Sequence, residues 1–225
     1  MISPTRSTEL ASMSEFLERA KKLRPDLSDW VVHYTKGPAD EAKEALREIL
    51  NTGLENRGRG ICFTESPVAQ FSQLFQIFQQ YNEPMLSPYG LAVKKEWLFQ
   101  RGGRPVIYLP EAEKQFLKDE VAHLFEEYEP GKKDFTWLRE WRVKDEVLQL
   151  SKADTIVIVP TVDEAYNLAF DVKVEFEYQG RGMEPLESTY MDVDWPFVTL
   201  EEIQKLEGQE TSDEKMVKLL RDLMS

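Results

Sequence analysis

The 225-residue chain contains a single cysteine, Cys62, and only two histidines, His33 and His123. One cysteine cannot form an internal disulfide, and this supply of thiols and imidazoles is too small for a cysteine-rich zinc site or a two-histidine metalloprotease helix. We therefore expect no metal centre of those kinds and no metal ligand among the residues of the functional site, while a magnesium site made of carboxylates alone stays open.

Long apolar runs are also missing. No stretch approaches the roughly 20 residues that a membrane-spanning helix needs, and the opening MISPTRSTEL lacks the apolar segment of a signal peptide. We expect a cytoplasmic protein without membrane contact.

Two nucleotide-binding motifs are absent, which removes the main support for a Rossmann or a P-loop protein. No G-x-G-x-x-G follows an expected strand, and no G-K-[ST] occurs.

Positive charge is scarce as well, since the chain has 41 acidic and 28 basic residues, which gives a net charge of -13. Nucleic acid is bound by clustered cations, so it is not a favoured partner, although a local basic site is compatible with the sequence. A basic protein would be attracted to the acidic surface.

Short β-branched and aromatic segments alternate irregularly with amphipathic ones, which favours an α+β fold over a doubly wound one. Strands are expected at 30–34, 61–64, 89–93, 105–109, about 141–149, 155–159 and 172–178. Helices are expected at about 13–23, 39–50, after Pro67, at 95–100, 111–129 and 162–169, and at the C-terminus. The helix over 111–129 is expected to pack through an apolar stripe that includes Phe116 and Leu124, and the chain is expected to loosen after Gly182. We divide the chain into an N-terminal helical arm (1–28), one domain (29–206) and a C-terminal linker and helix (207–225).

Four local features carry residues suited to chemistry. They are His33-Tyr34-Thr35 at the end of the first strand, Gly60-Ile61-Cys62-Phe63-Thr64-Glu65-Ser66-Pro67 along the second, Tyr89-Gly90 at the third, and Arg139-Glu140-Trp141-Arg142 at a later strand. Each also has a purely structural interpretation: a core histidine, a helix cap, or a surface ion pair worth little.

The order of these features resembles the ADP-ribosyltransferase superfamily. In that family, His-x-[Ser/Thr] is followed by a helix ending in Ile-Leu-x-x-Gly-Leu and then by Gly-x-Gly-Ile-Tyr-Phe. Here the matching segments are His33 to Thr35, Ile49-Leu50-Asn51-Thr52-Gly53-Leu54 and Gly58-Arg59-Gly60-Ile61-Cys62-Phe63. The resemblance covers residues 30–80 and extends to Glu140 by position. It implies a split β-sheet with flanking helices and NAD as substrate.

The resemblance also implies roles for individual residues. Glu140 would be the catalytic carboxylate that stabilises positive charge on the nicotinamide ribose, and His33 would bind ribose hydroxyls of the adenosine half. Trp141 would limit water around Glu140, and Arg139 or Arg142 would keep that carboxylate ionised or hold a pyrophosphate. The remaining cofactor-binding candidates are Thr35 and the Gly60 backbone for the nicotinamide amide, Tyr34, Phe63 or Tyr89 for stacking on its ring, and Thr64.

The motifs Cys-Phe-Thr-Glu-Ser-Pro, Tyr-Gly-Leu-Ala-Val-Lys-Lys-Glu-Trp-Leu and Arg-Glu-Trp-Arg-Val are also similar to the AbiGi-type abortive phage-resistance group. This implies a role in phage defence or in a toxin–antitoxin system. Cys62 departs from the family pattern because it stands where the tyrosine of Gly-Ile-Tyr-Phe belongs. An alternative interpretation is therefore a catalytically inactive member of the same fold that acts as an antitoxin or protein-binding inhibitor.

Overall fold

The computed structural model describes residues 15–17, 20, 27–78, 80, 84–169, 173–179, 182–189 and 195–207. Its centre is a seven-stranded open sheet in the order β13-β10-β4-β1-β3-β8-β5. The neighbouring strands are antiparallel except for β10 and β13, which are parallel. The strands are β1 (Trp30–Tyr34), β3 (Ile61–Thr64), β4 (Gly90–Lys94), β5 (Arg104–Pro105), β8 (Glu140–Val143), β10 (Thr155–Val159) and β13 (Phe197–Thr199). The protein is thus mixed α+β with a mostly antiparallel sheet, as expected in outline.

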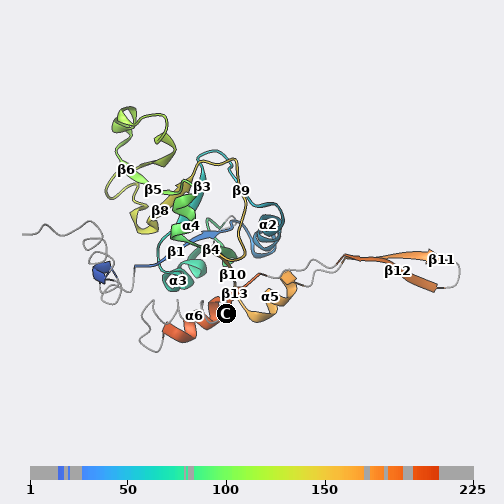
Figure 1. Cartoon of the computed structure of the whole chain (residues 1–225). Helices are drawn as coiled ribbons and strands as arrows, with labels where there is room; N and C mark the ends of the chain where they lie inside the picture. Colours follow the sequence, from blue (N-terminus) through green and yellow to red (C-terminus); the bar gives the residue numbers. More distant parts are fainter. Residues whose placement is uncertain are drawn as a thin grey trace, which may run out of the picture.

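Helices cover both faces of this sheet (Figure 1). On one face, α2 (Ala39–Thr52) and α5 (Val162–Ala169) contribute Leu46 and Leu168 to a core that includes Val31 and Phe63. On the other face, α3 (Val68–Phe78) and α6 (Leu200–Glu207) contribute to a second core around Val32. The alternation of Trp30, Val31 and Val32 between these two cores is the period-2 geometry of a strand.

Shorter elements surround the sheet. Helix α4 (Lys95–Gln100) follows β4, and β2 (Leu54–Glu55) pairs with β9 (Val147–Leu148). Between β5 and β8 the chain forms an insertion, residues 106–139, with the parallel pair β6 (Ile107–Leu109) and β7 (Phe125–Glu127). A separate hairpin is formed by β11 (Lys173–Gln179) and β12 (Gly182–Thr189).

The expected helix over 111–129 is wrong. This segment contains the 3₁₀ turns η1 (Glu111–Phe116) and η2 (Ala122–Leu124) and then strand β7. Phe116 is 77% exposed, so the apolar residues do not form one buried stripe. The carbonyls of His123 and Phe125 accept hydrogen bonds from Arg142. These carbonyls are therefore bonded to the sheet rather than within a continuous helix.

Two further predictions differ from the structure, and a third concerns segments that lie largely outside the described residues. The chain does not loosen after Gly182, because residues 182–189 form β12 against β11. The expected strands at 105–109 and 141–149 are each divided into two short strands. Of the N-terminal helix, residues 15–17 and 20 are helical, while the rest of it and the C-terminal helix lie outside the described residues.

Candidate functional site

A pocket of about 690 Å³ lies where β1 and β3 separate. These strands share a single register pair, Val32 with Thr64. Beyond it, the imidazole Nδ1 of His33 takes the place of a ladder bond and lies 2.8 Å from the carbonyl oxygen of Cys62. Helix α2 and the residues before β8 also line the pocket, whose volume is within the range of small-molecule sites.

The pocket gathers most of the candidate site residues. Its lining includes His33, Tyr34, Thr35, Gly60, Phe63, Thr64, Glu140 and Arg142, whereas Tyr89, Arg139 and Trp141 do not line it. These residues come from β1, β3 and β8, which are neighbours in the sheet although they are distant in the chain.

His33 has the environment of a neutral imidazole. Burial lowers its pKa, the hydrogen bond to Cys62 opposes that effect, and nearby Lys36 and Arg57 lower the pKa further. Because a carbonyl only accepts, Nδ1 must carry the proton, and in the neutral ring Nε2 is then an acceptor. The ring also meets Phe63 edge-on, with centroids 5.8 Å apart. A fixed imidazole of this kind suits a hydroxyl donor on a ligand.

His33 and Glu140 belong to opposite faces of the sheet. Cross-strand pairing aligns Val32, Thr64 and Glu140 in one row, and paired residues share a face. His33 follows Val32 and is therefore on the other face. Both residues are nonetheless among those that line the pocket.

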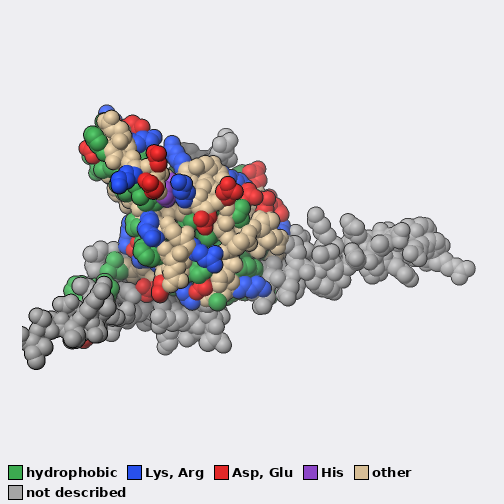
Figure 2. All heavy atoms as spheres, turned by 45° about the horizontal axis from the view of Figure 1, so that its top comes forward, with side chains coloured by type: hydrophobic (Ala, Val, Ile, Leu, Met, Phe, Trp, Pro, Cys, Tyr) green, Lys and Arg blue, Asp and Glu red, His purple; other side chains and the backbone are tan. Residues whose placement is uncertain are grey.

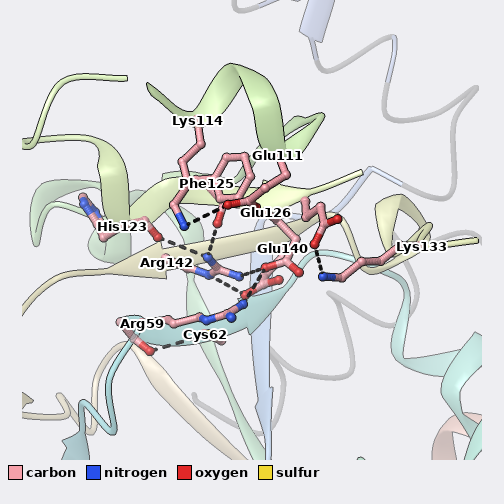
Figure 3. A network of polar contacts seen from close by, with 12 residues as sticks. Arg59, Cys62, Glu111, Lys114, His123, Phe125, Glu126, Lys133, Glu140 and Arg142 are labelled. Atoms are coloured by element: carbon pink, nitrogen blue, oxygen red, sulfur yellow. Dashed lines mark hydrogen bonds and ion pairs between the residues drawn. The ribbon is translucent and has the colours of Figure 1, made fainter. Parts of the chain in front are cut away.

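The Glu140 carboxylate belongs to a polar network centred on Arg142 (Figure 3). Its side chain is 11% exposed, and Oε1 accepts from Arg142 Nε at 2.7 Å. Arg142 also donates to the carbonyls of His123 and Phe125, at 3.1 and 2.8 Å, and to Glu126 Oε2 at 2.6 Å. Burial opposes the charge, but Glu140 and Glu126 more than compensate and raise the pKa of Arg142.

This network leaves Arg142 poorly suited to the expected contact with a pyrophosphate. The residue is 3% exposed, and four donor contacts go to protein oxygens. Arg142 does contact the Glu140 carboxylate, through Nε at 2.7 Å, and the expectation that it keeps this group ionised stays a prediction.

Cys62, the residue that departs from the family pattern, is half-buried and lines the pocket beside Glu140. Burial and the neighbouring Glu140 raise the pKa of its thiol to about 12. The thiol is therefore protonated near neutral pH and is a poor nucleophile.

The aromatic candidates are deeply buried. Tyr34 packs against Phe71 and Phe75 with ring centroids 4.9 and 5.1 Å away, and burial raises its pKa. Tyr89 lies in the core on the other face, where burial and Glu164 raise its pKa to about 12. Of the three rings, only Phe63 both lines the pocket and contacts His33.

Two polar candidates, Thr35 just after β1 and Thr64 at the end of β3, bind the protein's own backbone. The Thr35 hydroxyl donates to the Tyr89 carbonyl at 2.9 Å, and the Thr64 hydroxyl donates to the Leu138 carbonyl. Their hydroxyl protons are therefore committed, and each oxygen retains acceptor capacity for a ligand.

Gly60 is held in a conformation that suits glycine. Its φ is +109°, and an added Cβ would lie 2.9 Å from the Val143 carbonyl oxygen. The Asn56 side chain accepts from the backbone amides of Gly58 and Gly60 at 2.9 Å. Glycine at this position thus allows the loop to pass close to the Val143 backbone, and Gly60 itself lines the pocket.

The sequence pattern missed the roles of two carboxylates. Glu65 accepts from Lys95 at 2.8 Å, Arg139 at 2.7 Å and the Trp141 indole at 2.8 Å, and its side chain is 13% exposed. Arg139 and Trp141, expected beside Glu140, thus bind Glu65. In the sequence, the only signal for Glu65 is that a helix cap at Thr64-Glu65-Ser66 gives no reason for a glutamate there. No local motif points to the second carboxylate, Glu126.

Among the described residues, no group of three or more His, Cys, Asp or Glu side chains could hold a metal ion. No helix in the described part of the chain is long and apolar enough to cross a membrane. Comparison of the chain with protein-family models, with curated proteins and with solved structures found no match.

Proposed function

We propose that this chain binds NAD in the pocket between β1 and β3 and transfers ADP-ribose to an acceptor, in phage defence or a toxin–antitoxin system. The observation that supports this most is the convergence of His33, Gly60 and Glu140 on one pocket. Its volume and its neutral imidazole acceptor fit a ribose-containing ligand, and Lys36 and Arg57 supply positive charge nearby.

In the proposed reaction the bond between ribose C1′ and the nicotinamide nitrogen breaks, and nicotinamide leaves with the bonding electrons. An acceptor nucleophile forms the new bond to C1′ and releases its proton. In this reaction Glu140 would stabilise the positive charge that develops on the ribose, and His33 Nε2 would accept from a ribose hydroxyl. Phe63 shields the imidazole from water on one side.

The test combines NAD carrying a labelled adenylate moiety with the purified chain and mixed protein and nucleic-acid acceptors. Nicotinamide release and label transfer are followed together. We expect Glu140→Gln to abolish turnover while NAD still binds, and His33→Ala to weaken binding. Glu129→Gln, an exposed carboxylate paired with Lys132, is the matched control. Absence of NAD binding by calorimetry together with absence of nicotinamide release would reject the enzyme.

A second candidate is a catalytically inactive protein of the same architecture that binds a basic partner. Burial of the Tyr34 and Tyr89 rings and the protonated Cys62 thiol favour it. Figure 2 shows acidic side chains gathered toward one end of the displayed face, with both signs mixed elsewhere. This candidate predicts a stoichiometric complex that dissociates at high salt and is unaffected by Glu140→Gln or NAD.

A further inference from the structure

Glu126 lies outside every motif in the sequence, yet it reaches the network around Glu140 (Figure 3). It is 8% exposed and belongs to β7, within the insertion between β5 and β8. Its Oε2 lies 2.6 Å from Arg142 Nη2 and 3.7 Å from Arg59 Nη1. The adjacent Phe125 carbonyl and the His123 carbonyl bind Arg142 Nη1.

The planar guanidinium links these contacts to the pocket. The insertion binds both terminal nitrogens of Arg142, and Nε on the same plane donates to Glu140 at 2.7 Å. Rotation of the plane would break several of these bonds at once, so groups that fix Nη1 and Nη2 also fix the direction of Nε.

We propose that Glu126 is a positioning residue. Together with the two insertion carbonyls it fixes Arg142, and Arg142 in turn holds the Glu140 carboxylate toward the pocket. The insertion must therefore be packed against β8 for Glu140 to be correctly placed. The consequence for turnover rests on the proposed transferase function, whereas the effect on Arg142 can be measured without it.

The neighbouring residue provides a matched control. Glu127 is on the same strand and carries the same charge, but its side chain is 33% exposed and pairs with Lys133. Glu126→Gln and Glu127→Gln remove the same charge at adjacent positions. Only the first removes a partner of Arg142.

The experiment is ¹⁵N NMR of the full chain, with the Arg142 Nε–H resonance assigned by its loss in Arg142→Lys. We expect solvent exchange of this proton to become about tenfold faster in Glu126→Gln, because a charge-assisted bond is lost. Glu127→Gln should retain the wild-type rate. Glu126→Asp keeps the charge on a shorter side chain, so we expect an intermediate increase in the exchange rate. This variant replaces Glu126→Gln in the experiment if the glutamine variant does not fold.

Kinetics supply the second readout. Glu126→Gln should lower kcat for NAD with little change in KM, and Glu127→Gln should change neither. Wild-type exchange in both Glu126 variants, or equal acceleration in Glu127→Gln, would overturn the proposal. Absence of NAD turnover in the wild-type chain would instead reject the transferase function, and the exchange rates would still decide whether Glu126 fixes Arg142.

Discussion

At the level of single residues, the structure gives Glu65 and the proposed catalytic carboxylate Glu140 different surroundings. Glu65 joins the end of β3 to α4 and β8 through Lys95, Arg139 and Trp141. Glu140 lies beside Thr64 on the neighbouring strand, lines the pocket and forms an ion pair with Arg142. Two acidic residues that look alike in the sequence therefore have different surroundings.

We expect Glu65→Ala to lower the free energy of unfolding by about 3 kcal/mol, because it leaves two cations and an indole N–H without their shared acceptor. Urea unfolding followed by tryptophan fluorescence measures this loss. Glu129→Ala removes an exposed pair with Lys132 and should cost about 0.5 kcal/mol or less. Equal losses in the two variants would contradict the structural role of Glu65.

The lowered pKa of His33 predicts a dependence of stability on pH. Its folded-state pKa lies below the ordinary value of 6.5, so the unfolded chain binds the proton more readily. Stability should therefore fall as the pH drops below about 6.5, and His33→Gln should reduce this fall. Urea unfolding between pH 7.5 and 5.5 tests the sign. Burial also lowers the pKa of His123, so the His123→Gln variant measures the contribution of that residue to the pH dependence of stability.

At the level of elements, the pocket depends on the early separation of β1 from β3. Pairing ends at Val32 and Thr64, and the His33 imidazole binds Cys62 where another ladder bond would lie. The loop before β3 is held by the Asn56 side chain, which accepts from the backbone amides of Gly58 and Gly60. It brings the Gly60 backbone against that of Val143. A hydrogen bond from the His33 side chain thus replaces a backbone bond between the two strands, and their separation leaves space for a ligand.

Gly60→Ala should be more damaging than Gly58→Ala. Both positions have positive φ, but an added Cβ at Gly60 would meet the Val143 carbonyl at 2.9 Å, while nothing lies within 4 Å at Gly58. We expect Gly60→Ala to cost about 2 kcal/mol more than Gly58→Ala, from overpacking added to the shared backbone strain. Thermal unfolding of the two variants side by side measures the difference, and similar midpoints would show that β3 and β8 can move apart.

The contribution of α2 can be tested at its buried face. Leu46 is 0% exposed and packs in the core between α2 and the sheet. Leu46→Ala should cost about 3 kcal/mol through the cavity it creates. Chemical denaturation gives the value, with the exposed Glu41→Ala as control, and a loss below about 1 kcal/mol would mean that this core collapses around the smaller side chain.

For the whole molecule, charge restricts the partners. With a net charge of -13, we expect no measurable binding to duplex DNA at about 0.15 M salt. Fluorescence anisotropy with a labelled duplex provides the measurement, repeated at low salt. Tight binding that weakens steeply with added salt would contradict this and would point to a local basic site.

Most of the regular elements in the described part of the chain could be predicted from the sequence alone. Trp30–Tyr34, Ile61–Thr64 and Thr155–Val159 are buried strands, and Ala39–Thr52 is an amphipathic helix. Local propensity and apolar periodicity are enough to predict such segments. Part of the pocket lining was also predicted from motifs: of the catalytic and cofactor-binding candidates, Tyr89 and Arg139 do not line it, whereas lining residues such as Met85, Leu86 and Glu126 belong to none of those motifs.

Only the tertiary structure decided what those residues contact. The apolar residues of 111–129 favoured a helix, but Arg142 binds two of the segment's carbonyls and β7 forms instead. Likewise, register places His33 and Glu140 on opposite faces of the sheet, and Glu126 reaches Arg142 from 16 positions earlier in the chain. These outcomes depend on pairing between distant segments, whose free energy no local pattern of residues encodes.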